Sequence, residues 1–370
     1  MPQEKILVAL SLRESCAEAL TQAKAIAELR EAHLAVVHVL PEFYASRPLF
    51  PQFYSQEAIG YTVLQQKAFA AIDALLERTL ESHEEIEIQV VHGSAHGGVL
   101  DVAQQFGASL IVMGSESPER EHTVLGGITE KVVRASSSDV FVVRRVEGKA
   151  ILALTDFSKE SVPAIQHAVR LAEEKGLELV LGHVLPTATF ANYWAQPAGE
   201  GAYLTEALRD VASHSLSRWA EHYGALHSVM LEGEPAEEIA RVAKELEVAM
   251  VVVASHGQSG VERSPLGSTA EAIVRLCDAS VWVVRTPAVL DDIPAELLDE
   301  VDSESLPEQA DDADEELAED DADDADDADE DDADDADEGD ADDADEDDAD
   351  DADEGNDEDE HEDQDGSKSN

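Results

Sequence analysis

Residues 249–255 read Ala-Met-Val-Val-Val-Ala-Ser, and residues 111–115 read Ile-Val-Met-Gly-Ser. Both stretches are apolar at consecutive positions until they end on small residues. A strand has this composition when helices cover both faces of a parallel sheet. Amphipathic stretches with helical spacing separate such apolar runs along the chain. The alternation predicts an α/β fold with parallel, doubly wound sheets.

The same two stretches belong to a repeat, because they occupy equivalent places 140 positions apart. Other matching blocks follow in the same order: residues 6–10 and 151–155, 37–41 and 182–186, 129–131 and 270–272, and 142–144 and 283–285. Since the blocks keep their order, we interpret the repeat as a duplicated domain. We expect a first domain over residues 1–147, a second over 148–288 and a separate segment over 289–370. Each domain is predicted to hold one Rossmann-like sheet of five parallel strands.

The second copy shows the alternation of strands and helices clearly. Strands are expected near residues 150–155, 178–184, 226–231, 249–254 and 280–285. Helical periodicity runs through residues 162–175, 204–223, 235–245 and 269–276. Pro235 suits the first turn of its helix, where a backbone N–H would have no partner. Ligands of such sheets bind at the carboxyl ends of the strands, at the point where the strand order reverses.

The last segment differs from the rest of the chain in charge. From Asp291 onward it holds 46 of the 84 acidic residues, and Lys368 is its one basic residue, so about −45 of the net −60 lies there. A segment so poor in large apolar side chains cannot offset the entropy of ordering. We therefore expect a disordered polyacidic tail, which would suit the salt-rich cytoplasm of a halophilic organism. Loose cation binding, an arm for basic proteins and a solubility device stay open as its function.

Several classes of partner and site are not indicated. Excess negative charge repels phosphate backbones, so nucleic acid is not expected as a partner. No apolar run approaches the roughly 20 residues that span a bilayer, and the first residues lack the basic start of a signal peptide. Cys16 and Cys277 lie in different copies, without the spacing of a metal or redox site. We expect a cytoplasmic protein without membrane insertion and without a metal site.

A glycine-rich loop follows the fourth strand of the second copy. It contains Gly257 and Gly260, and it leads to the expected start of a helix. Gly267, Ser268 and Thr269 stand at that start. Glycines let the backbone approach a ligand, and the free N–H groups of a first helical turn favour an anion. The pattern indicates phosphate binding, but Ser268 would equally suit a plain helix N-cap.

The loop resembles the nucleotide-binding signature of the universal stress protein family, G-x2-G-x9-G-[ST]. Nine residues separate Gly257 from Gly267, as in that signature, and Ala254 stands in place of the first glycine. The resemblance extends over most of residues 4–287. It implies a fold of the adenine nucleotide alpha hydrolase-like kind in both copies.

The resemblance also implies a ligand, which is ATP with Mg²⁺ held through its phosphates. It implies that the carboxylate of Asp156 contacts the nucleotide and that Val184 lines the adenine pocket. His256 lies inside the loop, where a phosphate contact and a solvent-facing position are both open. The predicted site is formed by Asp156, Val184, Ala254, His256, Gly257, Gly267, Ser268 and Thr269.

The first copy departs from the signature. Its loop has Ser117 where the second glycine should be, and Ser11 replaces the aspartate at the end of the first strand. Glu116 and Glu119 place carboxylates where phosphates would lie, which is unfavourable at short range. We predict that this copy has lost nucleotide binding.

No motif of a dedicated enzyme is found. The sequence has no Gly-Lys-Ser or Gly-Lys-Thr of a Walker A loop and no G-x-S-x-G elbow. Fast ATP hydrolysis needs a water-positioning group and a cation clamp, and the loop offers only His256 and Arg263. We predict no catalytic residues and at most slow hydrolysis. The favoured function is a stress-response regulator that binds ATP and acts through a protein partner; the alternatives are a nucleotide-free dimerisation scaffold and an enzyme acting on a nucleotide-like substrate.

The last strand of each copy, residues 140–143 and 281–284, is too apolar to remain an exposed edge. In the family this strand pairs with its counterpart across a dimer. We therefore expect either internal pairing, as a pseudo-dimer, or a homo-oligomer of chains through these strands. His38 and His183 stand at equivalent places within strands, and we interpret both as structural.

Overall fold

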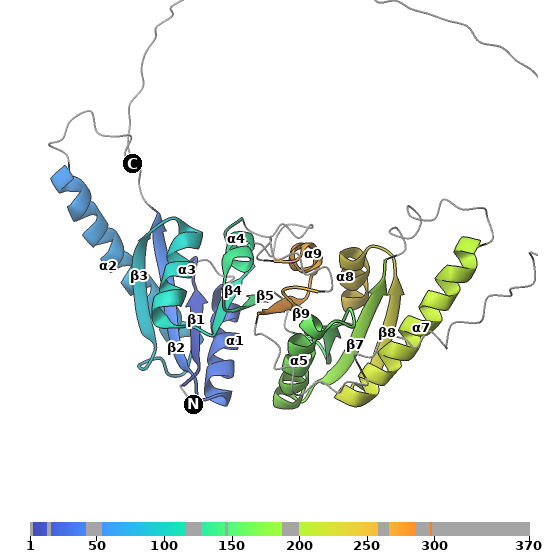
Figure 1. Cartoon of the computed structure of the whole chain (residues 1–370). Coiled ribbons are helices and arrows are strands. Elements are labelled where there is room, and N and C mark those ends of the chain that lie inside the picture. Colours follow the sequence, from blue (N-terminus) through green and yellow to red (C-terminus); the bar gives the residue numbers. More distant parts are fainter. Residues whose placement is uncertain are drawn as a thin grey trace, which may run out of the picture. The chain divides into compact units, whose positions relative to one another are not determined.

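The strands of the two copies form one sheet. The computed structural model describes residues 3–12, 16–41, 54–115, 127–144, 147–186, 200–257, 266–285 and 297. Within these residues ten strands follow one another in the order β3-β2-β1-β4-β5-β10-β9-β6-β7-β8 (Figure 1). The polyacidic tail lies outside the described residues, so what the sequence predicts for it stays a prediction. In the described part of the chain, no helix is both long enough and apolar enough to cross a membrane.

The first copy supplies the elements up to residue 143. They are β1 (Lys5–Ala9), α1 (Cys16–Leu29), β2 (His33–Pro41), α2 (Tyr54–Thr79), β3 (Glu87–Gly93), α3 (Ala95–Phe106), β4 (Leu110–Gly114), α4 (Gly127–Ala135) and β5 (Asp139–Val143).

The second copy repeats this order. Its elements are β6 (Ala150–Leu154), the short 3₁₀ turn η2 (Lys159–Ser161), α5 (Val162–Lys175), β7 (Glu178–Leu185), α7 (Glu200–Tyr223), β8 (His227–Glu232), α8 (Pro235–Glu245), β9 (Met250–Ala254), α9 (Ser268–Leu276) and β10 (Ser280–Val284). The strands and helices predicted for this copy are confirmed to within a few residues, and α8 begins at Pro235 as expected.

Helices cover both faces of the sheet, as the apolar strands predict. In β6, Ile151 packs in the same core as α5 and α7, whereas Leu152 packs in the same core as α8 and α9. Neighbouring residues of a strand point to opposite faces, which is why Val251 and Val252 of β9 are both fully buried. Within each copy every strand pair is parallel. The predicted doubly wound α/β fold is confirmed.

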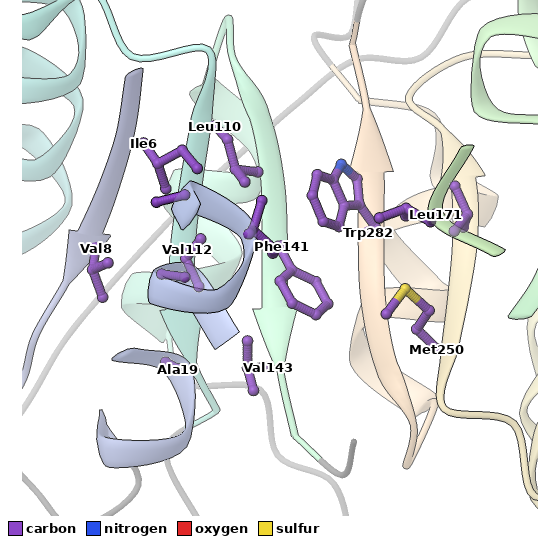
Figure 2. Packing of buried hydrophobic residues seen from close by; sticks show 14 of the residues in the cluster. Ile6, Val8, Ala19, Leu110, Val112, Phe141, Val143, Leu171, Met250 and Trp282 are labelled. Carbon is purple, nitrogen blue, oxygen red and sulfur yellow. The ribbon is translucent and has the colours of Figure 1, made fainter. Parts of the chain in front are cut away.

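The two predicted five-stranded sheets join edge to edge. β5 and β10 pair antiparallel, with Trp282 opposite Phe141. The two rings are stacked, with centroids 4.9 Å apart, and both side chains are fully buried. Figure 2 shows them side by side between the strands of the first and second copies. One core cluster accordingly runs through both copies, from Ile6 to Trp282.

The apolar last strands of the two copies cover each other's edges. β5 is hydrogen-bonded to β4 on one side and to β10 on the other, and β10 lies between β9 and β5. Neither strand has a free edge for a second chain. The chain therefore pairs internally, which is the first of the two expectations, and whether chains assemble further stays a prediction.

A buried histidine lies beside the junction of the two copies. His167 of α5 packs against the ring of Trp282, with centroids 4.5 Å apart. The side chain is buried, and its Nε2 has no hydrogen-bond partner among the described residues. Burial, together with the nearby guanidinium groups of Arg30 and Arg170, lowers the pKa of His167 to about 3. The imidazole is therefore neutral in the folded protein at neutral pH.

We expect acid to destabilise the fold through His167. Below pH 6.5 the unfolded chain protonates this residue, whereas the folded chain does not until about pH 3. The unfolded state thus binds more protons in this window, and stability falls as the pH decreases, by at most about 1.4 kcal/mol per pH unit. Above pH 6.5 both states are neutral and the contribution disappears. Urea unfolding at pH 7.5 and pH 5 should show a smaller acid loss for His167→Gln than for the wild type; equal losses would contradict this account.

Candidate functional site

An open cavity lies at the carboxyl ends of β6, β7 and β9. Its volume is about 1920 Å³. The chain leaves β6 toward β7 and β8 on one side and returns to β9 on the other side, so the strand order reverses between β6 and β9. Ligands of open α/β sheets bind at this kind of position. All eight residues predicted from the sequence line this one cavity: Asp156, Val184, Ala254, His256, Gly257, Gly267, Ser268 and Thr269.

Asp156 follows the end of β6 and is held by its own turn. Its Oδ1 accepts hydrogen bonds from the backbone N–H of Ser158, at 3.1 Å, and from the hydroxyl of the same residue. Phe157, between them, has a φ of 62°, in the left-handed region that non-glycine residues rarely adopt. The hydroxyl of Thr155 accepts the N–H of Phe157 at 3.0 Å. The turn therefore fixes the direction of the carboxylate before any ligand binds.

Gly257 brings the backbone after β9 against this carboxylate. A Cβ at position 257 would lie 2.2 Å from Oδ2 of Asp156, so any side chain there would force the carboxylate or the backbone to move. The backbone at this point can approach Asp156 only because glycine has no Cβ. The sequence predicted that the glycines of this loop let the backbone approach a ligand, and that stays a prediction; the structure shows the backbone of Gly257 beside Asp156.

The glycine-rich loop is closed at its base. The N–H of Gly267 donates to the carbonyl of Ser255 at 2.8 Å, and a Cβ at position 267 would lie 3.2 Å from that oxygen. The hydroxyl of Ser255 lies 3.0 Å from Nδ1 of His256, which faces the cavity. The loop residues 258–265, which include Gly260 and Arg263, lie outside the described residues.

The first turn of α9 faces the cavity. Gly267 is the N-cap of this helix, and Ser268 is its first helical residue. The alternative that Ser268 is only an N-cap is therefore excluded. The first N–H groups of a helix have no partner inside the helix, and Ser268 and Thr269 of this turn are exposed and line the cavity. This end of α9 can bind an anion through amides and hydroxyls together.

The apolar wall of the cavity includes Val184 of β7, which is buried, and a group of rings beside it. Nδ1 of His183 donates to the carbonyl of Thr155 at 2.8 Å, and its ring lies 4.2 Å from that of Phe157. Burial lowers the pKa of His183, which keeps it neutral. His38 makes the same contact in the first copy, to the carbonyl of Leu10 at 2.7 Å. Each histidine thus binds the backbone of the turn after the first strand of its copy, as expected for a structural role, and His183 also lines the cavity.

One wall of the cavity was missed by the sequence analysis. It is formed by α7, whose side chains at helical spacing face the cavity: Leu208, Val211, Ser215, Arg218 and Trp219. The spacing of these residues predicts a helix with one covered face. Nothing in it distinguishes a face that covers a cavity from one that covers a core.

The first copy keeps the backbone of the site but not its carboxylate. Leu12 has a φ of 61°, matching that of Phe157, so the turn after β1 has the same form. Ser11 stands in the place of Asp156, and its hydroxyl lies 3.2 Å from the Sγ of Cys16. The loop with Glu116 and Glu119 lies outside the described residues. Among the residues described anywhere in the chain, no group of three or more His, Cys, Asp or Glu side chains is placed to hold a metal ion.

Comparison with known proteins agrees with this architecture. A sequence model described as the Universal stress protein family matches residues 3–144 and residues 148–285. Universal stress protein MJ0531 of Methanocaldococcus jannaschii is 32% identical over 143 residues, which are 38% of this chain and 83% of that protein. A universal stress protein of Mycolicibacterium smegmatis is 24% identical over 277 residues, or 70% of this chain and 89% of that protein. The solved structure of a functionally unknown protein, PA1789 of Pseudomonas aeruginosa PAO1, has the same fold, with a TM-score of 0.56 at 20% identity over 80% of this chain and 96% of that one.

Proposed function

The chain belongs to the universal stress protein family, and on that premise we propose that it is a stress-response regulator whose second copy binds ATP. Occupancy of the cavity then biases the contacts of the protein with a partner protein in the cytoplasm. One observation carries the proposal. The backbone at Gly257 lies against the fixed carboxylate of Asp156, and the first turn of α9 lines the same cavity.

The nucleoside end of the ligand lies toward Asp156 in this proposal. The carboxylate accepts hydrogen bonds from the ribose hydroxyls, and Val184 with its neighbouring rings forms an apolar wall for adenine. Small-molecule sites are commonly about 300–1,000 Å³ in volume. A cavity of about 1920 Å³ therefore has room for a nucleotide and its hydrated cation.

The phosphates lie toward α9. The N–H groups of its first turn and the hydroxyls of Ser268 and Thr269 donate to phosphate oxygens, and the positive end of the helix dipole favours the negative charge. Mg²⁺ is held through the phosphates, and it offsets their charge in a chain that is strongly acidic. His256 lines the cavity beside this end of α9, and in this proposal its imidazole donates a hydrogen bond to a phosphate oxygen.

A nucleotide-free scaffold is the alternative function. The antiparallel pairing of β5 with β10 supports it, because that junction needs no ligand to form. The two functions differ in whether the cavity binds anything. In either case we expect ATP turnover near background, since the proposed site binds through amides and hydroxyls rather than through groups that activate water.

The experiment compares matched substitutions in the two copies. Asp156→Ser gives the second copy the residue that the first copy has at this place, and Ser11→Ala is the control. A hydrogen bond to a charged group contributes about 1.5–3 kcal/mol, so Asp156→Ser should weaken ATP–Mg²⁺ binding roughly 10- to 100-fold in titration calorimetry. Ser11→Ala should leave it unchanged. Absence of binding by the wild type at millimolar ATP favours the scaffold, and unchanged binding by Asp156→Ser places the site elsewhere.

A further inference from the structure

The two copies exchange arginines across their junction. Arg144 follows β5 of the first copy, and its guanidinium donates to the carbonyls of Val274 and, at 3.4 Å, Ala279 of the second copy. Arg285 follows β10 of the second copy, and its guanidinium donates to the carbonyls of Val133 and Arg134 of the first copy. Each copy therefore caps the C-terminal end of the other copy's last helix.

The backbone N–H of each arginine also donates a hydrogen bond to the other copy. The N–H of Arg144 donates to the hydroxyl of Ser280 at 3.0 Å, and the N–H of Arg285 donates to Oδ1 of Asp139 at 2.7 Å. Ser280 and Asp139 are the first residues of β10 and β5. The two arginines thus occupy equivalent positions on either side of the junction.

Only one of the two arginines, Arg144, contacts a helix that lines the cavity. Arg144 holds α9, whose first turn faces the cavity, whereas Arg285 holds α4 of the copy that lacks the carboxylate of Asp156. We propose that Arg144 of the first copy is a positioning residue for the phosphate-binding end of α9, so that the first copy helps to complete the site in the second. The inference rests on the proposed function.

The physical reason lies in the short length of α9. The helix has nine residues, so its two ends are only about 13 Å apart. Its first end is fixed by the bond between Gly267 and Ser255. The last carbonyls of a helix have no partner within it, and one of those of α9, that of Val274, is held by Arg144. A second contact from the first copy, the ion pair of Arg134 with Glu271, lies between these ends.

Charge acts in the same direction as geometry. The guanidinium of Arg144 is largely buried, and burial lowers its pKa while the nearby Cys277 and Asp278 raise it. A unit positive charge at a distance of about 13 Å favours a phosphate by roughly five- to tenfold in affinity at an effective dielectric constant near 20. Adenosine has no phosphate, so the charge of Arg144 should not change its affinity.

The test uses the full chain with Arg144→Met and the matched control Arg285→Met. Titration calorimetry should show ATP–Mg²⁺ binding weakened about five- to tenfold by Arg144→Met, with adenosine binding changed less than twofold. Arg144→Lys, which keeps the charge, should recover part of the loss. Arg285→Met should leave both ligands bound as in the wild type. Amide hydrogen exchange without ligand should rise in α9 for Arg144→Met and in α4 for Arg285→Met.

Three outcomes overturn the inference. The first is unchanged ATP affinity in Arg144→Met, and the second is an equal loss for ATP and adenosine, which marks a general structural effect. The third is an equal ATP loss in Arg285→Met. If the wild type binds neither ligand, the proposed function fails together with the inference, whereas wild-type affinity in every variant overturns the inference alone.

Discussion

Gly257→Ala should abolish detectable ATP binding, with a Kd raised at least about 100-fold. The added Cβ would lie 2.2 Å from Oδ2 of Asp156, far inside van der Waals contact. The carboxylate cannot simply rotate away, because Ser158 holds Oδ1 through its N–H and its hydroxyl. Either the loop or the turn after β6 must move. Displacements of this size remove hydrogen bonds to charged groups, each contributing about 1.5–3 kcal/mol.

The control for this substitution is Gly127→Ala at the start of α4 in the first copy. A Cβ there meets nothing within 4 Å, so both binding and stability should stay at wild-type levels. A double-mutant cycle identifies the cause. If the clash with the carboxylate is the reason, Gly257→Ala should cost less stability in an Asp156→Ala background than in the wild type. ATP affinity within threefold of the wild type in Gly257→Ala would place the ligand outside this cavity.

Trp282→Ala should cause the largest loss of stability, about 3–5 kcal/mol, which is the usual range for removal of a buried aromatic side chain. The ring is fully buried and stacks on Phe141 across the junction of the two copies. It also packs against His167, and its Nε1–H donates to Asp139 at 3.4 Å. The substitution thus opens a cavity at the place where the copies join and leaves a buried carboxylate without one donor.

Urea unfolding of Trp282→Ala and Trp282→Phe measures this effect. Phenylalanine keeps a ring against Phe141 and loses only the indole N–H and part of the volume, so it should cost less than half as much. Both variants should retain the parallel strands within each copy. A loss below about 1 kcal/mol for Trp282→Ala would mean that the junction contributes little to the stability of the chain.

The strands and the loop motif were predictable because their signals are local. Consecutive apolar residues mark a strand covered on both faces, as at Val251 and Val252. Pro235 marks the start of α8. The spacing of Gly257 and Gly267 placed a glycine-rich loop before a helix, and the structure brings these glycines together with Asp156 around one cavity.

The remaining features depend on contacts between segments far apart in the chain. Pairing of β5 with β10 was one of two expectations, because an apolar strand edge looks the same in sequence whether its partner lies in the same chain or in another. The exchange of Arg144 and Arg285 has no local signal either, since a single arginine after a strand does not reveal which carbonyls it reaches. The role of α7 as a cavity wall was not predictable either, because its amphipathic pattern is the same for a helix that covers a core.

In the proposed function, the two copies of the duplicated domain have different tasks. The first keeps the backbone turn at Leu12 and the bond from His38 to Leu10, but it carries Ser11 where the second copy has Asp156. It supplies β5 to the shared sheet and Arg144 to α9. The second copy holds the cavity with all eight predicted residues.

The stoichiometry of ATP binding to the full chain tests this division most directly. Titration calorimetry with ATP–Mg²⁺ should give one molecule bound per chain, and Asp156→Ser should weaken that binding roughly 10- to 100-fold while Ser11→Ala leaves it unchanged. Two molecules per chain, or one whose affinity is unchanged in Asp156→Ser and lost in Ser11→Ala, would contradict the account.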